Sequence, residues 1–273
     1  MLSTLNSHAR DADICFFEED HHYEVKGCNT YTSVTTVVHH LFPGFDAIVM
    51  ATKMVSNPKF PSAYRYKKYR KIVEGLDKKQ SINALIKEWD RNRDECASLG
   101  TLMHANIEKY YNDMNPVDDS KEFQFFKNYA QIQQDNNLIP YRTEWVIYDT
   151  VSHIAGSIDM LYTKGLVCNG KKILTMVDWK RSKKINKKSF FSDGLGCMSL
   201  ESDCNFVHYS LQLNMYKYIL EKNYDVIIDK MYIVVFHPDN KSFLEYEVPD
   251  RQDDIANIVW DHKRTIMSES RDV

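Results

Sequence analysis

Short segments in the middle of the chain alternate apolar and polar residues, which is the pattern of a strand with one buried face. Three such segments follow one another, at residues 141–148, 153–162 and 172–180. Gly165 and Gly170 stand near the two ends of the connection between the second and the third, as in a hairpin. Two further apolar segments follow at residues 226–237 and 242–248. The pattern therefore predicts a sheet built around three consecutive strands.

Apolar residues recur at helical spacing on both sides of these strands. Helices are predicted over residues 81–113, 120–136, 208–222 and 250–267, and a loop rich in Gly and Ser over residues 190–204. Gly100 falls inside the longest helix, where glycine costs about 1 kcal/mol relative to alanine, so it indicates close packing or a break. Nearer the N-terminus, residues 14–33 indicate a hairpin or meander, followed by helices that end near Leu41 and Ser56.

This order of elements predicts an α/β protein with a central mixed sheet flanked by helices. We expect residues 1–95 to form an N-terminal hairpin and helical lobe, and residues 96–273 to form the core. A chain of 273 residues is long enough for both, and we expect the two parts to make one compact unit.

Composition places the chain among ordinary soluble globular proteins. No apolar run approaches the roughly 18–20 residues that span a bilayer, and residues 1–13 are too polar for a secretory signal. None of the six cysteines forms a CxxC pair, which argues against a zinc ribbon and favours reduced thiols. We therefore expect a soluble intracellular protein with no membrane partner.

The net charge of −3 conceals two basic tracts without an acid, at residues 59–71 and 180–188. The first tract interleaves tyrosines with Lys and Arg, which suits base stacking and phosphate contact, but it also fits an amphipathic helix that buries its rings. The second tract is either a solvated face or a phosphate-binding segment. Its Arg181, Lys183 and Lys184 are our candidates for substrate contact.

The candidate chemistry lies in two strand segments, Gly156-Ser157-Ile158-Asp159 and Asp178-Trp179-Lys180. Asp178 and Lys180 are two apart on one strand, so their side chains leave the same face. Pairing of the strands can bring Asp159 to that end of the sheet. Two buried carboxylates and a lysine are costly to bury unless they hold a metal ion and position a water. This arrangement suggests phosphodiester hydrolysis with Mg²⁺ or Mn²⁺, the backbone carbonyl of Trp179 being an additional ligand candidate.

Two helices add candidates. His104 lies four residues after Gly100 and on the same helical face, where it is either a metal ligand or a satisfied core histidine. Gln212 and Tyr216 share a face of the helix that follows the three strands. They are either substrate-binding groups or ordinary residues of an amphipathic helix.

Taken in order, the His104 helix, Gly156-x-x-Asp159, Asp178-x-Lys180 and the Gln212-x-x-x-Tyr216 helix resemble the PD-(D/E)XK nuclease superfamily. Within it they are similar to the RecB-like exonuclease branch, which includes mitochondrial genome maintenance exonuclease and nucleases of phages and large viruses. The resemblance covers roughly residues 96–236. Residues 31–36 are in addition similar to N-terminal regions of phage and large-virus nucleases of this type, which suggests a phage or viral origin.

The resemblance implies a restriction-endonuclease-like core and a metal held by His104, Asp159, Asp178 and the Trp179 carbonyl. It makes Lys180 the catalytic lysine and gives Glu144, on the preceding strand, an accessory catalytic role beside Asp159 and Asp178. Some relatives carry an iron–sulfur cluster on late cysteines. We expect none here, since no cysteine follows Cys204.

The leading hypothesis is a metal-dependent DNA nuclease, an exonuclease acting on DNA ends or single strands, with a role in DNA repair or recombination. RNA stays open as a substrate, and so does the oligomeric state. One alternative is a nuclease fold that binds nucleic acid or a partner protein without cutting. Another is a metal-dependent hydrolase of small phosphates, against which the basic tracts argue, because a small substrate needs no extended positive surface.

Overall fold

The computed structural model describes residues 1–189 and 192–269. Positions 190 and 191, at the start of the predicted loop, lie outside these ranges. The described strands are β1 (Ile14–Phe17), β2 (His22–Val25), β3 (Cys28–Ser33), β4 (Ile139–Asp149), β5 (Ile154–Cys168), β6 (Lys171–Lys180), β7 (Val226–Val235) and β8 (Leu244–Glu247). The α-helices are α1 (Leu2–Leu5), α2 (Val34–His40), α3 (Ala47–Val55), α4 (Lys78–Tyr111), α5 (Lys121–Asp135), α6 (Asn205–Asn223) and α7 (Gln252–Glu269). Three 3₁₀ helices are η1 (Ala9–Asp13), η2 (Tyr64–Tyr69) and η3 (Gly196–Met198).

The strands form one mixed sheet in the order β1-β2-β3-β5-β6-β7-β8, with β4 paired to the other side of β5. The β3–β5 and β6–β7 pairs are parallel, and the other pairs are antiparallel. The prediction of an α/β protein with a central mixed sheet flanked by helices is therefore confirmed.

Strand β5 has two different partners along one of its edges. Near its start, Ile154 and Ala155 pair with β3, and from Met160 onward it pairs with β6. Residues 156–159 lie between these two partners, while β4 runs along the opposite edge. The sheet consequently forks at the segment that carries the Gly156-x-x-Asp159 motif.

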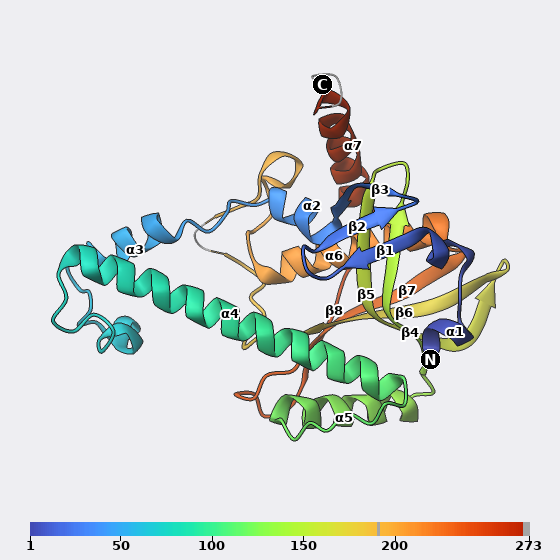
Figure 1. Ribbon diagram of the computed structural model, residues 1–273, viewed down its shortest axis with the longest axis horizontal. Coiled ribbons are helices and arrows are strands. Elements are labelled where there is room, and N and C mark those ends of the chain that lie inside the picture. Colours follow the sequence, from blue (N-terminus) through green and yellow to red (C-terminus); the bar gives the residue numbers. More distant parts are fainter. Residues whose placement is uncertain (190–191, 270–273) are drawn as a thin grey trace. The chain divides into compact units, whose positions relative to one another are not determined.

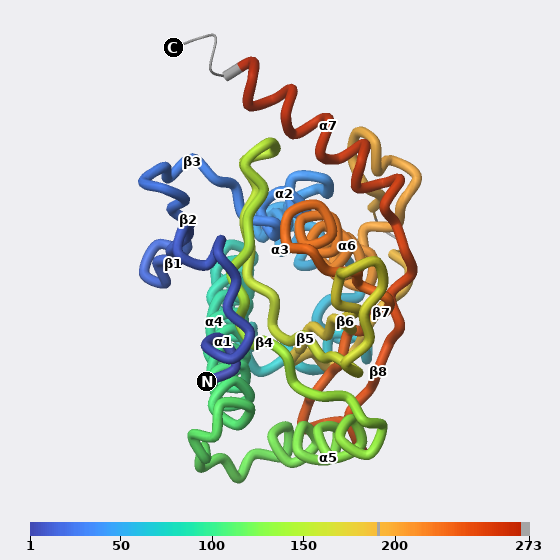
Figure 2. The backbone as a smooth tube through the Cα atoms, turned by 90° about the vertical axis from the view of Figure 1, so that its right-hand side faces the viewer, coloured from blue at the N-terminus to red at the C-terminus, as the bar shows by residue number. Residues whose placement is uncertain are grey.

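Helices cover both faces of this sheet. On one face α6 packs against β7, and α2 and α7 pack against α6 (Figure 1). On the other face α5 lies across the sheet from α6 (Figure 2). Its Phe126 and Tyr129 contact Trp179 of β6. The apolar core is thereby divided into two layers, one on each side of the strands.

The hairpin between β5 and β6 is tighter than the glycine spacing predicts. It turns at Asn169 and Gly170, both with positive φ, which is the backbone of a two-residue type I′ turn. Gly165 instead lies inside β5, with φ +73°, where the pairing register shifts between Thr163 and Val167. Glycine serves there as a bulge residue rather than as a turn residue.

The chain divides into two compact units, residues 1–43 with 103–273, and residues 44–102. This division differs from the expected boundary at residue 95. The hairpin β1–β2–β3 belongs to the first unit, because β3 pairs with β5. Helix α4 runs unbroken through Gly100, and an added Cβ there would meet nothing within 4 Å, so neither a break nor close packing explains this glycine.

The second unit has its own apolar cluster. Ala51, Val73 and Leu85 are buried at its centre. Trp89 packs against the cluster and donates a hydrogen bond from Nε1 to the hydroxyl of Tyr69 at 3.1 Å. The unit therefore holds its helices together with side chains from residues 44–102 alone.

Candidate metal centre

Three adjacent strands bring one carboxylate each into a row. In the β4–β5 pair, Thr143 and Trp145 face Met160 and Ile158, so Glu144 stands opposite Asp159. In the antiparallel β5–β6 pair, Met160 faces Val177. Asp159, which precedes Met160, therefore stands opposite Asp178, which follows Val177. Like charges on directly opposed strand positions repel each other. The row therefore calls for a cation.

Helix α4 places His104 at one end of this row. Its Nδ1 lies 3.6 Å from Oε1 of Glu144 and 3.7 Å from Oδ1 of Asp159. Its Nε2 lies 3.1 Å from the carbonyl oxygen of Trp179. His104, Glu144 and Asp159 can each offer one ligand atom within 4.8 Å of the others. The structure thus brings His104, Asp159 and the Trp179 carbonyl together, and it adds Glu144.

The backbone is distorted where Glu144 and Asp159 meet. Glu144 has φ +43°, in the left-handed region that costs a non-glycine residue of order 1 kcal/mol or more. Ile158 and Met160 would share a face in a regular strand, yet they belong to the two different core layers. Oδ2 of Asp159 accepts a hydrogen bond from the Trp179 amide at 2.7 Å, which ties the distorted segment to β6.

Asp178 and Lys180 form the other end of the row. Their side chains leave the same face of β6, and Lys180 Nζ lies 2.6 Å from Asp178 Oδ2. Lys180 Nζ also lies 4.7 Å from the ring centre of Tyr209, on α6. Asp178 is not part of the group formed by His104, Glu144 and Asp159. The predicted set of ligands is therefore only partly assembled, with Asp178 turned toward the lysine.

Both oxygens of Asp178 are buried, and within the described ranges neither accepts a well-aligned hydrogen bond. The contact with Lys180 is thus an ion pair without hydrogen-bond geometry. A buried carboxylate without hydrogen bonds is rare in proteins unless it binds an ion or takes part in catalysis. Together with two further carboxylates, a carbonyl and an imidazole, it fits a divalent cation that prefers oxygen ligands. The imidazole suits Mn²⁺ better than Mg²⁺.

The crowding of charge shifts the pKa values of these groups. Burial, assisted by the charge on Asp159, raises the pKa of Asp178 to about 6 despite the nearby Lys180. Burial also raises the pKa of Asp159. Burial alone would lower the pKa of His104, but Asp159 and Glu144 outweigh it and raise the value to about 9. Excess negative charge is thus the dominant electrostatic feature of the site.

Lys180 responds to the same charge. Burial disfavours its ammonium form, but the carboxylates of Asp178 and Asp159 outweigh burial and hold its pKa above the usual range. In the metal-free protein these carboxylates therefore favour the ammonium form of Lys180.

Gly156 and Tyr216 fit each other. A Cβ on Gly156 would lie 2.6 Å from Cε1 of Tyr216 and 3.2 Å from Val34. The Tyr216 ring is buried, and its hydroxyl accepts a hydrogen bond from Nε2 of Gln212 at 3.0 Å. Of the two predicted substrate-binding residues, Tyr216 thus packs behind the fork of the sheet and positions β5, while Gln212 is half-buried beside it.

The three predicted substrate cations differ in their surroundings. Arg181 is mostly buried, and its Nε donates a hydrogen bond to Oε1 of Glu122 on α5 at 2.9 Å. Lys183 pairs with Asp239. Lys184 is exposed and takes part in no ion pair with a described residue. The arginine is therefore a structural tie between β6 and α5, and the two lysines lie at the surface.

Sequence patterns gave little sign of three further residues at the site. Ser157 donates a hydrogen bond from Oγ to Oε2 of Glu144 at 3.1 Å. Burial, with the charge of Glu144, raises the pKa of Tyr23, a residue of β2, to about 12. The Tyr209 ring lies against Lys180. Only the alternation of residues 22–25 hinted that Tyr23 points inward.

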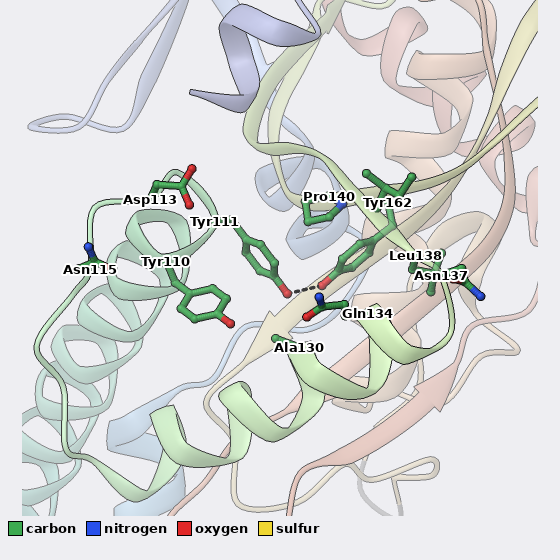
Figure 3. A pocket seen from close by; sticks show the side chains of 11 residues that line it. Tyr110, Tyr111, Asp113, Asn115, Ala130, Gln134, Asn137, Leu138, Pro140 and Tyr162 are labelled. Atoms are coloured by element: carbon green, nitrogen blue, oxygen red, sulfur yellow. Dashed lines mark hydrogen bonds between the residues drawn. The ribbon is translucent and has the colours of Figure 1, made fainter.

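A separate cavity of about 580 Å³ lies between the end of α4, helix α5, the start of β4 and the middle of β5 (Figure 3). Tyr111 and Tyr162 meet at its wall, with their hydroxyls 2.5 Å apart. In the part of the chain that the structure describes, neither a lysine nor an arginine lines it, and none of the carboxylates of the row does. It is therefore distinct from the candidate metal centre and unsuited to phosphate.

Among the described residues, no helix combines the length and the apolar character needed to cross a bilayer. Comparison with protein-family models and with curated proteins finds no match. Among solved structures, the crystal structure of SSO0001 is similar at 21% identity with a TM-score of 0.28. The match covers 54% of this chain and 58% of SSO0001, so the chain spans little more than half of that protein. At that score the likeness carries no argument about function.

Proposed function

We propose that this protein is a metal-dependent nuclease of the PD-(D/E)XK type that hydrolyses phosphodiester bonds in DNA, acting as an exonuclease on ends or single strands. The observation that carries the proposal is the row of Glu144, Asp159 and Asp178 on three adjacent strands. His104 closes one end of the row, and Lys180 closes the other.

His104, Glu144, Asp159 and the Trp179 carbonyl would hold a Mg²⁺ or Mn²⁺ ion, and Asp178 stands next to them in the row, paired with Lys180. A bound divalent cation activates a water and stabilises negative charge on the phosphate. The three carboxylates bring more negative charge than one lysine and one histidine offset, which favours binding of a cation over an empty, protonated site.

Lys180 is placed to orient the attacking water. In the metal-free protein the carboxylates hold its pKa above the usual range, and its ammonium can donate hydrogen bonds to the attacking water and to a phosphate oxygen. The Tyr209 ring restricts where Nζ can move. Ser157 fixes Glu144, and Tyr216 fixes the backbone of β5, so the carboxylates are held in place before substrate arrives.

The test is cleavage of end-labelled linear single-stranded, duplex and flapped DNA, RNA, and a covalently closed single-stranded circle, each with Mg²⁺ or Mn²⁺. We expect shortening of linear DNA, an intact circle, and no cleavage with a chelator. Lys180→Ala should reduce the rate at least about 100-fold, as removal of a positioned hydrogen-bond donor to the developing charge does. Lys164→Ala, an exposed lysine of the hairpin, is the matched control and should cleave like the parent.

Cleavage by Lys180→Ala at the parent's rate would overturn the proposal. A parent protein that binds these substrates but cuts none of them under any metal would instead favour the non-cutting nuclease fold. Cleavage of the closed circle would support a nuclease but exclude an exclusively exonucleolytic mode, because the circle has no ends.

A further inference from the structure

The two units of the chain differ in charge. Residues 44–102 contain 12 Lys and Arg against 7 Asp and Glu, a net charge of +5. The remaining residues contain 23 against 31, a net charge of −8. The unit with the candidate metal centre is therefore acidic overall, and the net positive charge that attracts a polyanion lies in the other unit.

Ion pairs within the second unit sharpen this difference. Arg91 pairs with Glu88 and Glu95, and Arg93 pairs with Asp90 and Asp94. These pairs use most of the acids of the unit. The basic tract at residues 59–71 is different, because in the described part of the chain none of its cations forms an ion pair and all are exposed. They are Lys59, Arg65, Lys67, Lys68, Arg70 and Lys71.

The basic tract has a defined fold. The rings of Phe60 and Tyr66 meet edge to face inside it, with their centres 5.1 Å apart. Arg70 donates hydrogen bonds back to the carbonyls of Pro61 and Ser62, which closes the segment on itself. Tyr69 is anchored to Trp89 of α4. Apolar side chains thus point inward and the lysines outward, on a preformed support.

One aromatic residue of the tract is left outside. Tyr64, the first residue of η2, is 84% exposed, whereas Tyr66 is buried and Tyr69 is half-buried. An exposed ring among unpaired cations is the arrangement in which proteins stack an unpaired base while they neutralise its phosphates. The bases of a duplex are stacked inside it and an acidic peptide has none, so neither ligand could use the Tyr64 ring. A single strand therefore fits the tract better than either.

We propose that the basic tract is a binding site for single-stranded nucleic acid, in which the lysines contact consecutive phosphates and a base stacks on Tyr64. The choice of DNA as the bound strand rests on the proposed nuclease function. Binding of a polyanion by the second unit is independent of that function. In this proposal the basic tract binds the strand, so the initial attraction does not depend on the acidic unit that carries the candidate metal centre.

The experiment measures binding of a fluorescent 20-nucleotide single strand to the full chain carrying Lys180→Ala, in chelator, from 50 to 200 mM salt. The test variant combines Lys59→Gln, Lys67→Gln and Lys71→Gln, three exposed lysines with no contact that supports the fold. Each phosphate contact on a single strand contributes roughly 0.7 to the slope of log affinity against log salt, so the slope should fall by about 2. Affinity at 100 mM salt should drop at least 10-fold.

The matched control combines Lys109→Gln, Lys164→Gln and Lys241→Gln in the first unit, which removes the same charge from exposed positions. It should keep the parent's slope and affinity within about twofold. Tyr64→Leu should weaken binding at least fivefold without a change of slope, and Tyr64→Phe should restore it. Duplex DNA and polyglutamate should compete poorly with the single strand.

Equal loss in the control, or parental binding by the triple variant, would overturn the proposal. So would a duplex or polyglutamate that displaces the strand at equal concentration, because the site would then read charge alone. These outcomes are independent of cleavage. If the parent cuts DNA but the triple variant binds the strand like the parent, only the proposed binding site is rejected. If the parent binds the strand through the tract but never cuts it, only the proposed nuclease function is rejected.

Discussion

Gly156 and Tyr216 occupy adjoining space at the fork of the sheet, where a Cβ on the glycine would lie 2.6 Å from Cε1 of the tyrosine. The tyrosine is buried and bonded to Gln212, so its ring has little room to retreat. The glycine of the Gly156-x-x-Asp159 motif is therefore required by packing, three residues before a carboxylate of the candidate metal centre.

Gly156→Ala should destabilise the protein by about 1–3 kcal/mol, the usual cost of overpacking, and should reduce cleavage by displacing Asp159. Denaturant unfolding measures the first effect, and the end-labelled assay measures the second. Combining it with Tyr216→Leu should recover part of the stability, because the clashing ring is gone. Gly100→Ala is the contrasting control. No atom stands near its added Cβ, so it should gain up to about 1 kcal/mol of helix stability.

Asp178→Asn should stabilise the metal-free protein while abolishing cleavage. Folding raises the pKa of Asp178 to about 6, above its unfolded value, so the folded state binds more protons than the unfolded state between about pH 4 and pH 6. The free energy of unfolding of the parent therefore falls as pH rises through that window, and the penalty persists above it. At 1.36 kcal/mol per pKa unit, the variant should gain at most about 2–3 kcal/mol at pH 7, less what Lys180 loses with its ion-pair partner, and almost nothing at pH 4.

Denaturant unfolding of both proteins in chelator, from pH 4 to pH 8, checks this prediction. Added Mn²⁺ should stabilise the parent at pH 7 more than the variant, because the cation offsets the same repulsion. A variant that is less stable than the parent at pH 7 in chelator would show that the ion pair with Lys180 outweighs the burial of Asp178.

The local sequence pattern was sufficient for the element order and for part of the site. Asp178 and Lys180 meet because residues two apart on a strand share a face, a rule that needs no long-range information. The pattern could not place the N-terminal hairpin, since the pairing of Thr32 with Ile154 joins positions far apart in the chain. For this reason the sequence did not indicate that Tyr23 would interact with Glu144.

Local irregularity explains the remaining differences at the site. An unbroken alternation would send Ile158 and Met160 to one face, whereas β5 is distorted between them and Glu144 adopts a positive φ. These distortions bring Glu144 into contact distance of His104. Propensities average over regular elements and contain no signal for such a strained position. Similarly, the cationic character of Arg181 is visible in the sequence, but its burial against Glu122 is not.

Glu144→Gln should weaken metal binding about as strongly as His104→Ala, because both side chains offer a ligand atom to the same group. A merely accessory acid would leave metal affinity unchanged and lower only the cleavage rate. His104→Ala should reduce affinity for Mn²⁺ more than for Mg²⁺, since imidazole nitrogen is a better ligand for manganese. Calorimetric titration of each protein with the two metals separates these outcomes.

Asp113→Asn is the matched control for the loss of one carboxylate, because Asp113 is exposed and lies outside the row. It should bind both metals like the parent. Loss of metal affinity in this control would mean that overall charge, rather than the geometry of the row, governs binding.

Arg181→Gln should lower stability rather than the salt dependence of DNA binding. The Arg181–Glu122 pair joins β6 to α5 with both side chains mostly buried, and removal of one member leaves the other charge buried without its partner. Such a loss costs about 3–5 kcal/mol, whereas the double replacement with Glu122→Gln should cost less than the sum of the two single replacements. Thermal or denaturant unfolding of the three variants measures the coupling. If Arg181→Gln instead keeps parental stability and reduces the salt slope of DNA binding by about 0.7, the arginine contacts a phosphate and the structural assignment is wrong.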